Sequence, residues 1–248
     1  MPEGPSIVIL KEQASAFAGR RILRVDGNTS IAKERLRGRR IEALRSWGKH
    51  FLIELGDFSL RVHFLLFGSY RINERREDLT PRLTLGFARG AELNLYSCSV
   101  RFIDQPLDEV YDWRADVMSD QWDAALARRR LRAAPDTLAC DALLNQDWFA
   151  GVGNIIKNEV LFRIRVHPLS TVGALPPRQL QALVREARQY SFDFLEWKKA
   201  YVLRKHWLAH TRHTCPRCGI PFVKAHLGTT HRRSFFCESC QVRYPAAG

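Results

Sequence analysis

Two pairs of closely spaced cysteines near the C-terminus restrict the fold of this chain more than any other feature. Two Cys-x-x-Cys turns can place four thiolates at the corners of a tetrahedron, which is the ligand set of structural zinc sites. The spacing therefore predicts one structural Zn²⁺ that holds a hairpin in shape. Its expected ligands are Cys215, Cys218, Cys237 and Cys240, with eighteen residues between the two pairs.

The charge of the chain indicates a polyanionic partner. It contains 39 lysine and arginine residues against 26 aspartate and glutamate residues, so the formal net charge is +13, and the sequence pI is near 9.9. Nucleic acid is the expected partner. A membrane surface is not expected, because the basic residues are spread through the sequence and form no polybasic tail. No apolar run approaches the roughly 20 residues that span a bilayer, and no secretory signal is visible, so a cytoplasmic, nucleoid-associated location is expected.

The first 112 residues are expected to form an antiparallel β-sandwich that follows an N-terminal helix. Apolar residues recur at helical spacing from Pro5 to Ala18. Seven strand-like segments follow, and glycine-containing turns separate most of them. Short strands at such intervals are typical of a sandwich or a flattened barrel. The segments are 21–25, 40–46, 50–55, 59–64, 69–72, 82–88 and 92–96.

Residues 113–212 are expected to form an all-helical domain, and residues 213–248 the zinc hairpin, which gives an α+β chain. The basic run Arg128 to Arg132 fits either a solvated helix face or a DNA contact. An apolar helix is predicted from Leu143, ending in a glycine turn before Asn154, and further helices are predicted over 155–163 and 177–197. Asn154 is expected to cap its helix or to donate to a phosphate, because the first N–H groups of a helix favour an anion.

The start of the chain, Met1-Pro2-Glu3-Gly4-Pro5, contains a candidate nucleophile. Removal of Met1 would leave Pro2 with a secondary amine. An α-amine titrates near pH ~8 and a lysine near ~10.4, so the α-amine is far more often neutral and reactive at pH 7. It can attack a carbonyl-like carbon to form an iminium, and Glu3 could transfer a proton beside it. Taken alone, however, a Met-Pro start favours a disordered terminus.

Three segments together resemble the formamidopyrimidine-DNA glycosylase and endonuclease VIII family of base-excision repair enzymes. They are the start MPEGP, the segment LLNQDWFAGVGNIIKNEVLFRIRVHP from Leu143 to Pro168, and the cysteine hairpin that ends RRSFFCESCQ at Gln241. Their order and spacing extend the resemblance over nearly the whole chain. The middle segment matches the helix-two-turn-helix motif of this family.

The resemblance implies roles for particular residues. Pro2 is expected to attack C1′ of the damaged nucleotide, and Glu3 to assist opening of the sugar ring. Lys49 matches a lysine that contacts phosphate near the lesion, although an exposed strand-end lysine is the simpler interpretation of its sequence context. Asn154 and Arg232 match two further phosphate ligands.

The family also inserts a wedge into the space that the flipped-out base leaves. Leu65, Leu66 and Phe67 lie at the corresponding position in this sequence. An apolar wedge can fill the void in the base stack. A run of three apolar residues is otherwise most simply the end of a buried strand.

The activity implied is that of a bifunctional DNA glycosylase and AP lyase that acts through an N-terminal proline Schiff base and β,δ-elimination. The expected partner is damaged DNA, with no small-molecule cofactor, and nothing in this architecture requires more than a monomer. The segment Ser97 to Asp104 lacks most of the motif of the purine-directed branch. This favours the endonuclease VIII-like branch and hence oxidised pyrimidines. The alternatives are a purine-directed glycosylase, a non-catalytic DNA binder on the same fold, and a zinc-ribbon protein that binds RNA or the ribosome.

Overall fold

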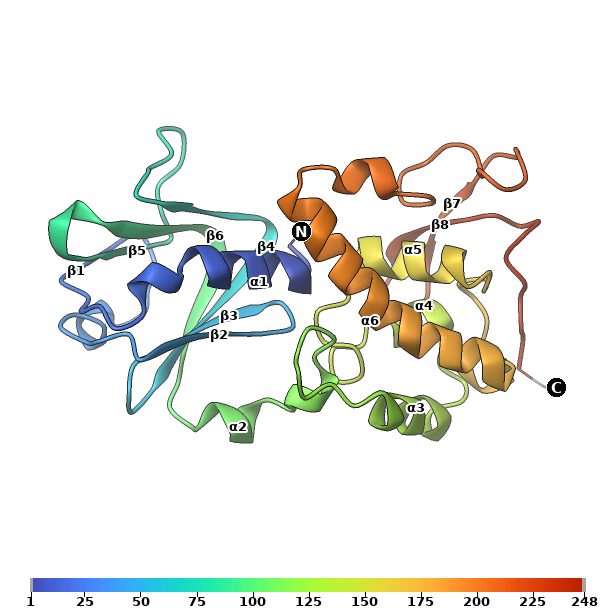
Figure 1. Ribbon diagram of the computed structural model, residues 1–248, viewed down its shortest axis with the longest axis horizontal. Coiled ribbons are helices and arrows are strands. Elements are labelled where there is room, and N and C mark those ends of the chain that lie inside the picture. Colours follow the sequence, from blue (N-terminus) through green and yellow to red (C-terminus); the bar gives the residue numbers. More distant parts are fainter. Residues whose placement is uncertain (1, 247–248) are drawn as a thin grey trace. The chain divides into compact units, whose positions relative to one another are not determined.

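Most of the strands lie in the first part of the chain and most of the helices in the second. The computed structural model (Figure 1) describes residues 2–246. The chain divides into two compact units, Met1–Tyr111 and Asp112–Gly248. The first unit contains an antiparallel sheet and an N-terminal helix, and the second contains helices and a C-terminal two-stranded hairpin. The predicted α+β fold class is confirmed, while the division of residues 112–248 into a helical domain and a separate hairpin domain stays a prediction.

The sheet of the first unit has six strands, in the order β1-β5-β6-β4-β3-β2, and every neighbouring pair is antiparallel. Segments 59–64 and 69–72, predicted as two strands, belong to the single strand β4, and the strand predicted over 92–96 continues to residue 103 as β6. The strands are β1 (Arg24–Asp26), β2 (Ala43–Trp47), β3 (His50–Glu54), β4 (Ser59–Ile72), β5 (Leu83–Gly86) and β6 (Glu92–Ile103).

Helix α1 (Gly4–Gln13) packs against β2 and β3 (Figure 1). Its apolar residues Ile7 and Leu10 are buried in the same core as Phe51 of β3. The helix ends before the predicted Ala18, because the chain tightens into a 3-10 turn over Ser15–Phe17. A short helix, α2 (Leu107–Val110), completes this unit.

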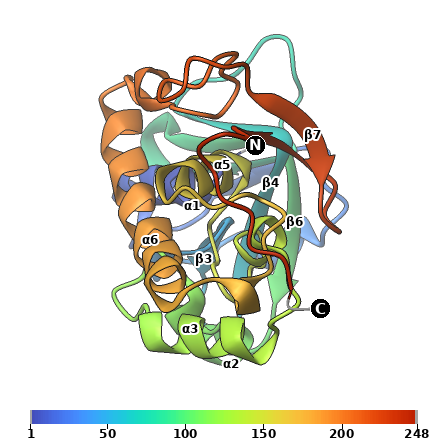
Figure 2. The ribbon, with the colours of Figure 1, turned by 90° about the vertical axis from the view of Figure 1, so that its right-hand side faces the viewer.

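Four α-helices build most of the second unit: α3 (Ala124–Ala133), α4 (Ala139–Ala142), α5 (Asn154–Arg163) and α6 (Pro177–Lys199). Short 3-10 turns also occur in the chain, over Lys33–Arg35, Ala88–Gly90, Trp113–Ala115, Val172–Ala174 and Leu203–His206. Helix α5 packs against α6 and against the C-terminal hairpin of β7 (Val223–Leu227) and β8 (Arg232–Phe236). Figure 2 shows α5 at the centre of this unit. Among residues 2–246, no helix is both long and apolar enough to cross a membrane.

The predicted helix from Leu143 is wrong. Helix α4 stops at Ala142, and the chain then follows turns as far as Gly153. The side chain of Gln146 holds this stretch, because its amide donates to the carbonyls of Leu144 and Val152 and accepts a hydrogen bond from the N–H of Gly151. Such hydrogen bonds between a side chain and nearby backbone groups compete with the backbone hydrogen bonds of a helix.

Candidate nucleic-acid interface and metal site

The start of the chain is part of the folded first unit. Glu3 occupies the N-cap position of α1 and is 2% exposed, and Pro2 precedes it, half-buried. The carbonyl of Glu3 accepts a hydrogen bond of 2.8 Å from the N–H of Ser6. Pro5 fits the first helical turn because the N–H that it lacks would have no partner within the helix. The segment thus places a buried carboxyl group one residue after the candidate nucleophile.

Lys49 lies in the two-residue turn between β2 and β3. Gly48 supplies the positive φ of 53° that such a turn requires. Burial, together with the charges of Arg61, His63 and Lys49, lowers the pKa of His50 to about 3. Burial and the neighbouring cations also lower the pKa of His63. At neutral pH the two imidazoles are therefore uncharged, and Lys49 and Arg61 carry the positive charge of this region.

The segment Leu65 to Phe67 leaves the regular pairing of the sheet. Phe64 of β4 lies opposite Cys98 of β6, but the next paired residue, Ser69, lies opposite Tyr96. The intervening residues of β4 form an irregularity that exposes three large apolar side chains. These side chains are therefore not a buried strand end: Leu65, Leu66 and Phe67 are 50%, 51% and 80% exposed.

Asn154 is the first residue of α5, and Gly153 occupies the N-cap position, so the expectation that Asn154 caps the helix is wrong. Its side-chain amide instead donates a hydrogen bond of 3.0 Å to the carbonyl of Arg233 in β8. The structure thus brings the start of α5 against the strand that carries Arg232. Asn154 retains a second amide hydrogen in this geometry.

Arg232 begins β8, opposite Leu227 of β7, and is half-buried. Next to it, the Nε group of Arg233 donates a hydrogen bond of 3.3 Å to Nε2 of His226 on the other strand. The neighbouring Lys224 side chain lies 3.3 Å from Nδ1 of His213. The hairpin therefore carries several cationic side chains, as its sequence predicts.

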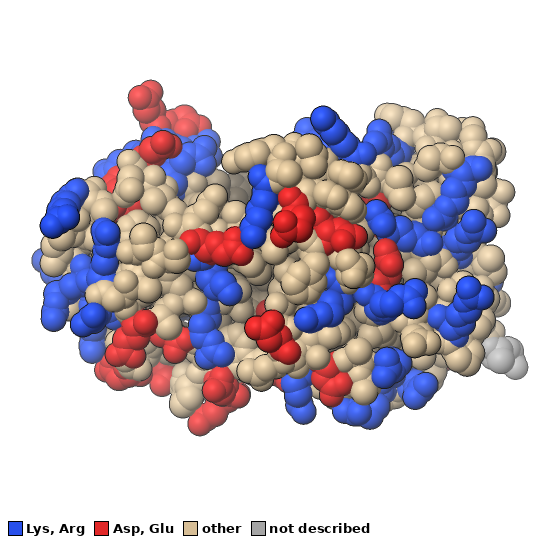
Figure 3. All heavy atoms as spheres, viewed as in Figure 1, with Lys and Arg blue, Asp and Glu red and all other residues tan. Residues whose placement is uncertain are grey.

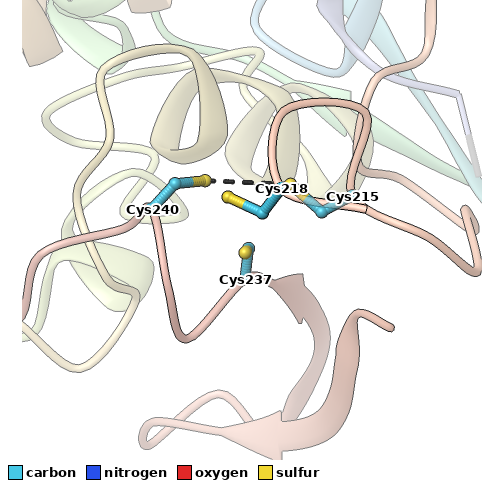
Figure 4. A group of neighbouring side chains, drawn as sticks. All are labelled: Cys215, Cys218, Cys237 and Cys240. Carbon is cyan, nitrogen blue, oxygen red and sulfur yellow. Dashed lines mark hydrogen bonds between the residues drawn. The ribbon is translucent and has the colours of Figure 1, made fainter. Parts of the chain in front are cut away.

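The four cysteines predicted as metal ligands come together (Figure 4). Their Sγ atoms all lie within 4.8 Å of one another, and those of Cys215 and Cys240 are 3.8 Å apart. Four sulfurs bound tetrahedrally to Zn²⁺ at about 2.3 Å would be separated by about 3.8 Å, so the residues fit this ion. The two Cys-x-x-Cys turns have the same hydrogen bond. In each, the carbonyl of the first cysteine, Cys215 or Cys237, accepts a hydrogen bond from the N–H four residues later, of Gly219 or Gln241.

A side chain inside the first Cys-x-x-Cys turn attaches the cysteine cluster to α5. The guanidinium of Arg217 lies 4.0 Å from the centre of the Phe162 ring and donates to the carbonyls of Phe162 and Arg163, at the C-terminal end of the helix. These carbonyls have no partner within the helix. Arg217 was not predicted as a site residue, because the sequence gives no indication that two segments 55 residues apart are in contact.

The predicted site residues divide between the two units. Pro2, Glu3, Lys49 and the exposed segment Leu65 to Phe67 belong to the first, and Asn154, Arg232 and the four cysteines to the second. Of the basic run on α3, Arg130 is bound within its own unit, to Asp112 and to the carbonyl of Asp147. On the face drawn in Figure 3, acidic and basic side chains are intermixed.

Two family models match this chain. The model described as the formamidopyrimidine-DNA glycosylase N-terminal domain matches residues 1–103, and the one described as the formamidopyrimidine-DNA glycosylase H2TH domain matches residues 115–198. In fold, 96% of the chain superimposes with a TM-score of 0.84 on 99% of the Lactococcus lactis formamidopyrimidine-DNA glycosylase bound to DNA containing an AP site, at 23% identity. The fold is therefore that of a DNA glycosylase of this type.

Relatives by sequence lie on the endonuclease VIII side. The chain is 30% identical to endonuclease 8-like 3 of Xenopus laevis over 80% of its own length and 34% of that protein, and 29% identical to endonuclease 8 2 of Mycobacterium bovis over 97% of its own length and all of that protein. It thus spans about a third of the endonuclease 8-like 3 proteins that it matches. The chain belongs to the formamidopyrimidine-DNA glycosylase and endonuclease VIII family, on its endonuclease VIII-like side.

Proposed function

We propose that this chain is a bifunctional DNA glycosylase and AP lyase of base-excision repair. The observation that carries the proposal is the start of the chain, where Pro2 directly precedes a buried carboxyl group, Glu3, at the beginning of α1. A DNA binder without catalytic activity needs neither residue. Membership of a family of DNA glycosylases supports the proposal independently.

In the proposed reaction, the nitrogen of Met-processed Pro2 attacks C1′ of the damaged nucleotide, and the bond between C1′ and the base breaks. The base departs with the electron pair of that bond and takes up the proton that the Pro2 nitrogen loses. The carboxyl group of Glu3 protonates the ring oxygen as the sugar opens, which leaves an iminium between Pro2 and C1′. Loss of a C2′ proton then expels the 3′-phosphate, a second elimination expels the 5′-phosphate, and water releases Pro2.

The remaining predicted residues bind DNA in this proposal. Lys49, Asn154 and Arg232 contact phosphates, and neutral His50 and His63 leave Lys49 as a cation near the sheet surface. Leu65, Leu66 and Phe67 fill the space of the flipped-out nucleotide. Their exposure supports this role, because a wedge must be accessible before DNA binds.

One Zn²⁺ bound by Cys215, Cys218, Cys237 and Cys240 would have a structural role. Four thiolates complete its coordination, so no position is open for water or substrate. The metal would hold the two Cys-x-x-Cys turns together at the base of the hairpin that carries Arg232. No step of the reaction depends on it.

Oxidised pyrimidines and abasic sites are the proposed substrates. Support comes from the endonuclease VIII-like relatives. A purine-directed activity is the alternative. A direct comparison of lesions will distinguish the two.

Borohydride trapping tests both the mechanism and the lesion preference. The Met-processed protein is incubated with duplexes that carry an abasic site, thymine glycol or 8-oxoguanine, and is then reduced. We expect a covalent complex whose modified peptide begins at Pro2, with a higher yield for thymine glycol than for 8-oxoguanine. Protein that retains Met1, in which the Pro2 nitrogen is an amide, should lose the complex at Pro2 and keep its DNA affinity. Tight binding without a complex on any substrate would instead identify a non-catalytic DNA binder.

A further inference from the structure

The tip of the hairpin is attached to α4 by one carboxylate. Asp141, which is 9% exposed, accepts hydrogen bonds from the N–H of Thr229 at 2.9 Å and from the N–H and hydroxyl of Thr230 at 3.2 and 2.9 Å. The preceding Gly228 has a φ of +71°, and a Cβ atom there would collide with the carboxylate of Asp141. The turn is therefore built around this carboxylate.

Helix α5 attaches the next part of the hairpin. The Nζ group of Lys157, a fully buried residue, donates to the Ser234 hydroxyl at 2.7 Å and to the Arg233 carbonyl at 3.2 Å. The side chain of Asn158 donates to the same carbonyl at 3.3 Å and accepts a hydrogen bond from the N–H of Phe235 at 3.2 Å. Together with Asn154, three side chains of one helix hold the carbonyl of Arg233.

Arg232 lies between these two attachments. Thr230 is fixed two residues before it, and Arg233 and Ser234 are fixed directly after it. Because side chains alternate along a strand, Arg232 leaves β8 on the same face as Ser234, which is the face that Lys157 contacts. We propose that Asp141 and Lys157 are positioning residues that hold Arg232 for its contact with a DNA phosphate, neither of them contacting the DNA.

This inference rests on the proposed function, because it requires Arg232 to bind DNA. The test measures the Kd for a duplex with a tetrahydrofuran abasic-site analogue, at several salt concentrations, for Asp141→Asn and Lys157→Met. In Asp141→Asn an amide replaces one of two carboxylate oxygens that both accept hydrogen bonds. We expect about tenfold weaker binding, the effect of losing one charge-assisted hydrogen bond, with one zinc retained per chain. We also expect a salt-dependence slope lower by about one unit, because one phosphate contact is lost.

A double-mutant cycle with Arg232→Ala shows whether the effect passes through this arginine. If it does, Asp141→Asn added to Arg232→Ala should change Kd by less than about twofold, because coupled residues are not additive. Asp116→Asn is the matched control, since Asp116 is also a buried aspartate of this unit and accepts a hydrogen bond from the N–H of Met118. It should bind as the unmodified protein does.

Several outcomes would overturn the inference. Unchanged binding by Asp141→Asn and Lys157→Met would do so, as would a full tenfold loss in the Arg232→Ala background. If Asp141→Asn loses zinc or does not fold, Asp141 is needed for the stability of the hairpin itself. The milder variant Thr230→Val, which removes only the hydroxyl bound to Asp141, then decides, and unchanged DNA binding by this variant would overturn the inference. If Arg232→Ala itself binds DNA normally, the proposed DNA contact fails, and the failure lies with the proposed function.

Discussion

Gly68 lies so close to Phe64 that a Cβ atom added to it would come within 2.7 Å of the Phe64 Cβ atom. This close approach lets β4 leave its pairing with β6 after Phe64 and resume it at Ser69. A side chain at position 68 would force the backbone apart, so Gly68→Ala should displace the exposed segment Leu65 to Phe67. We expect it to lose base removal from duplex DNA while keeping zinc.

The exposed segment itself should matter for duplex substrates only. Leu66→Ala and Phe67→Ala should slow the removal of thymine glycol from a duplex by about tenfold, because unpairing a base costs a few kcal/mol that the wedge offsets. The same lesion in a single strand should be removed at nearly the original rate. Leu23→Ala is the matched control, since Leu23 is 52% exposed in the same unit. Equal losses on duplex and single strand would rule out the wedge role.

Metal content should separate the clustered cysteines from the isolated ones. Cys237→Ser should lose zinc and unfold the hairpin, because three thiolates hold the ion poorly. Cys140→Ser should keep one zinc per chain, since the Cys140 side chain lies in the helical core. Elemental analysis of the two purified variants measures this directly. Zinc retained in Cys237→Ser would mean that another side chain replaces the missing sulfur.

Glu159 of α5 is, like Asp141 of α4, a buried carboxylate, and folding should depend on it. It is fully buried, and its oxygens accept hydrogen bonds of 2.7 to 3.1 Å from the N–H groups of Leu208, Ala209 and His210. Glu159→Gln replaces one acceptor oxygen with a donor that faces these groups. We expect the free energy of unfolding, measured in urea, to fall by about 2–3 kcal/mol. Glu196→Gln, at an exposed position of α6, should leave it unchanged.

Stability should decrease on mild acidification because burial lowers the pKa of four histidines in the folded chain, His50, His63, His167 and His210. Burial is the main cause that lowers the pKa of His50 from 6.5 to about 3 and that of His210 from 6.5 to about 4. Between pH 6.5 and 4 the unfolded chain therefore binds more protons than the folded chain. The contribution of these histidines to the free energy of unfolding is fully present above pH 6.5. It is lost as the pH falls, by up to about 1.4 kcal/mol per pH unit for each histidine.

Measurements from pH 6.5 to 5 separate the contribution of the histidines from that of the carboxylates with low pKa values. Glu92 and Asp112 have pKa values near 2, chiefly because arginines hydrogen-bond to them, so their contribution is lost only at lower pH. Urea unfolding at pH 6.5, 5.75 and 5 should show a smaller slope for His50→Gln. The exposed His231→Gln is the control and should keep the original slope. An identical slope in all three proteins would contradict the assignment.

Local patterns predicted the elements that carry their own periodicity or chemistry. The helix that became α1 follows from apolar spacing, the helix that became α5 follows the glycine turn before it, and the cysteine cluster follows from two short motifs. The turn between the strands predicted over 40–46 and 50–55 follows from its glycine, Gly48. In each of these cases the residues that determine the structure are close together in the sequence.

Contacts between distant segments were not predictable in this way. Lys157 in the sequence is an ordinary helical lysine, and its burial is understood from its contacts with Arg233 and Ser234, which lie 76 and 77 residues away in the sequence. The exposure of Leu66 depends on the unequal lengths of β4 and β6 across the irregularity. The prediction of a helix from Leu143 was wrong because the side chain of Gln146 forms hydrogen bonds with the backbone of its own turn. An apolar pattern does not reveal such bonds.

The carbonyl of Arg233, held by three side chains of α5, also limits how the length of the hairpin can vary. Adding or removing one residue between Thr230 and Arg233 would turn every later side chain of β8 to the opposite face. After a deletion, Arg233 would occupy the place of Arg232, and Phe235 the place of Ser234 beside the ammonium group of Lys157. The four-residue turn between β7 and β8, residues 228–231, should therefore reject insertions and deletions of a single residue.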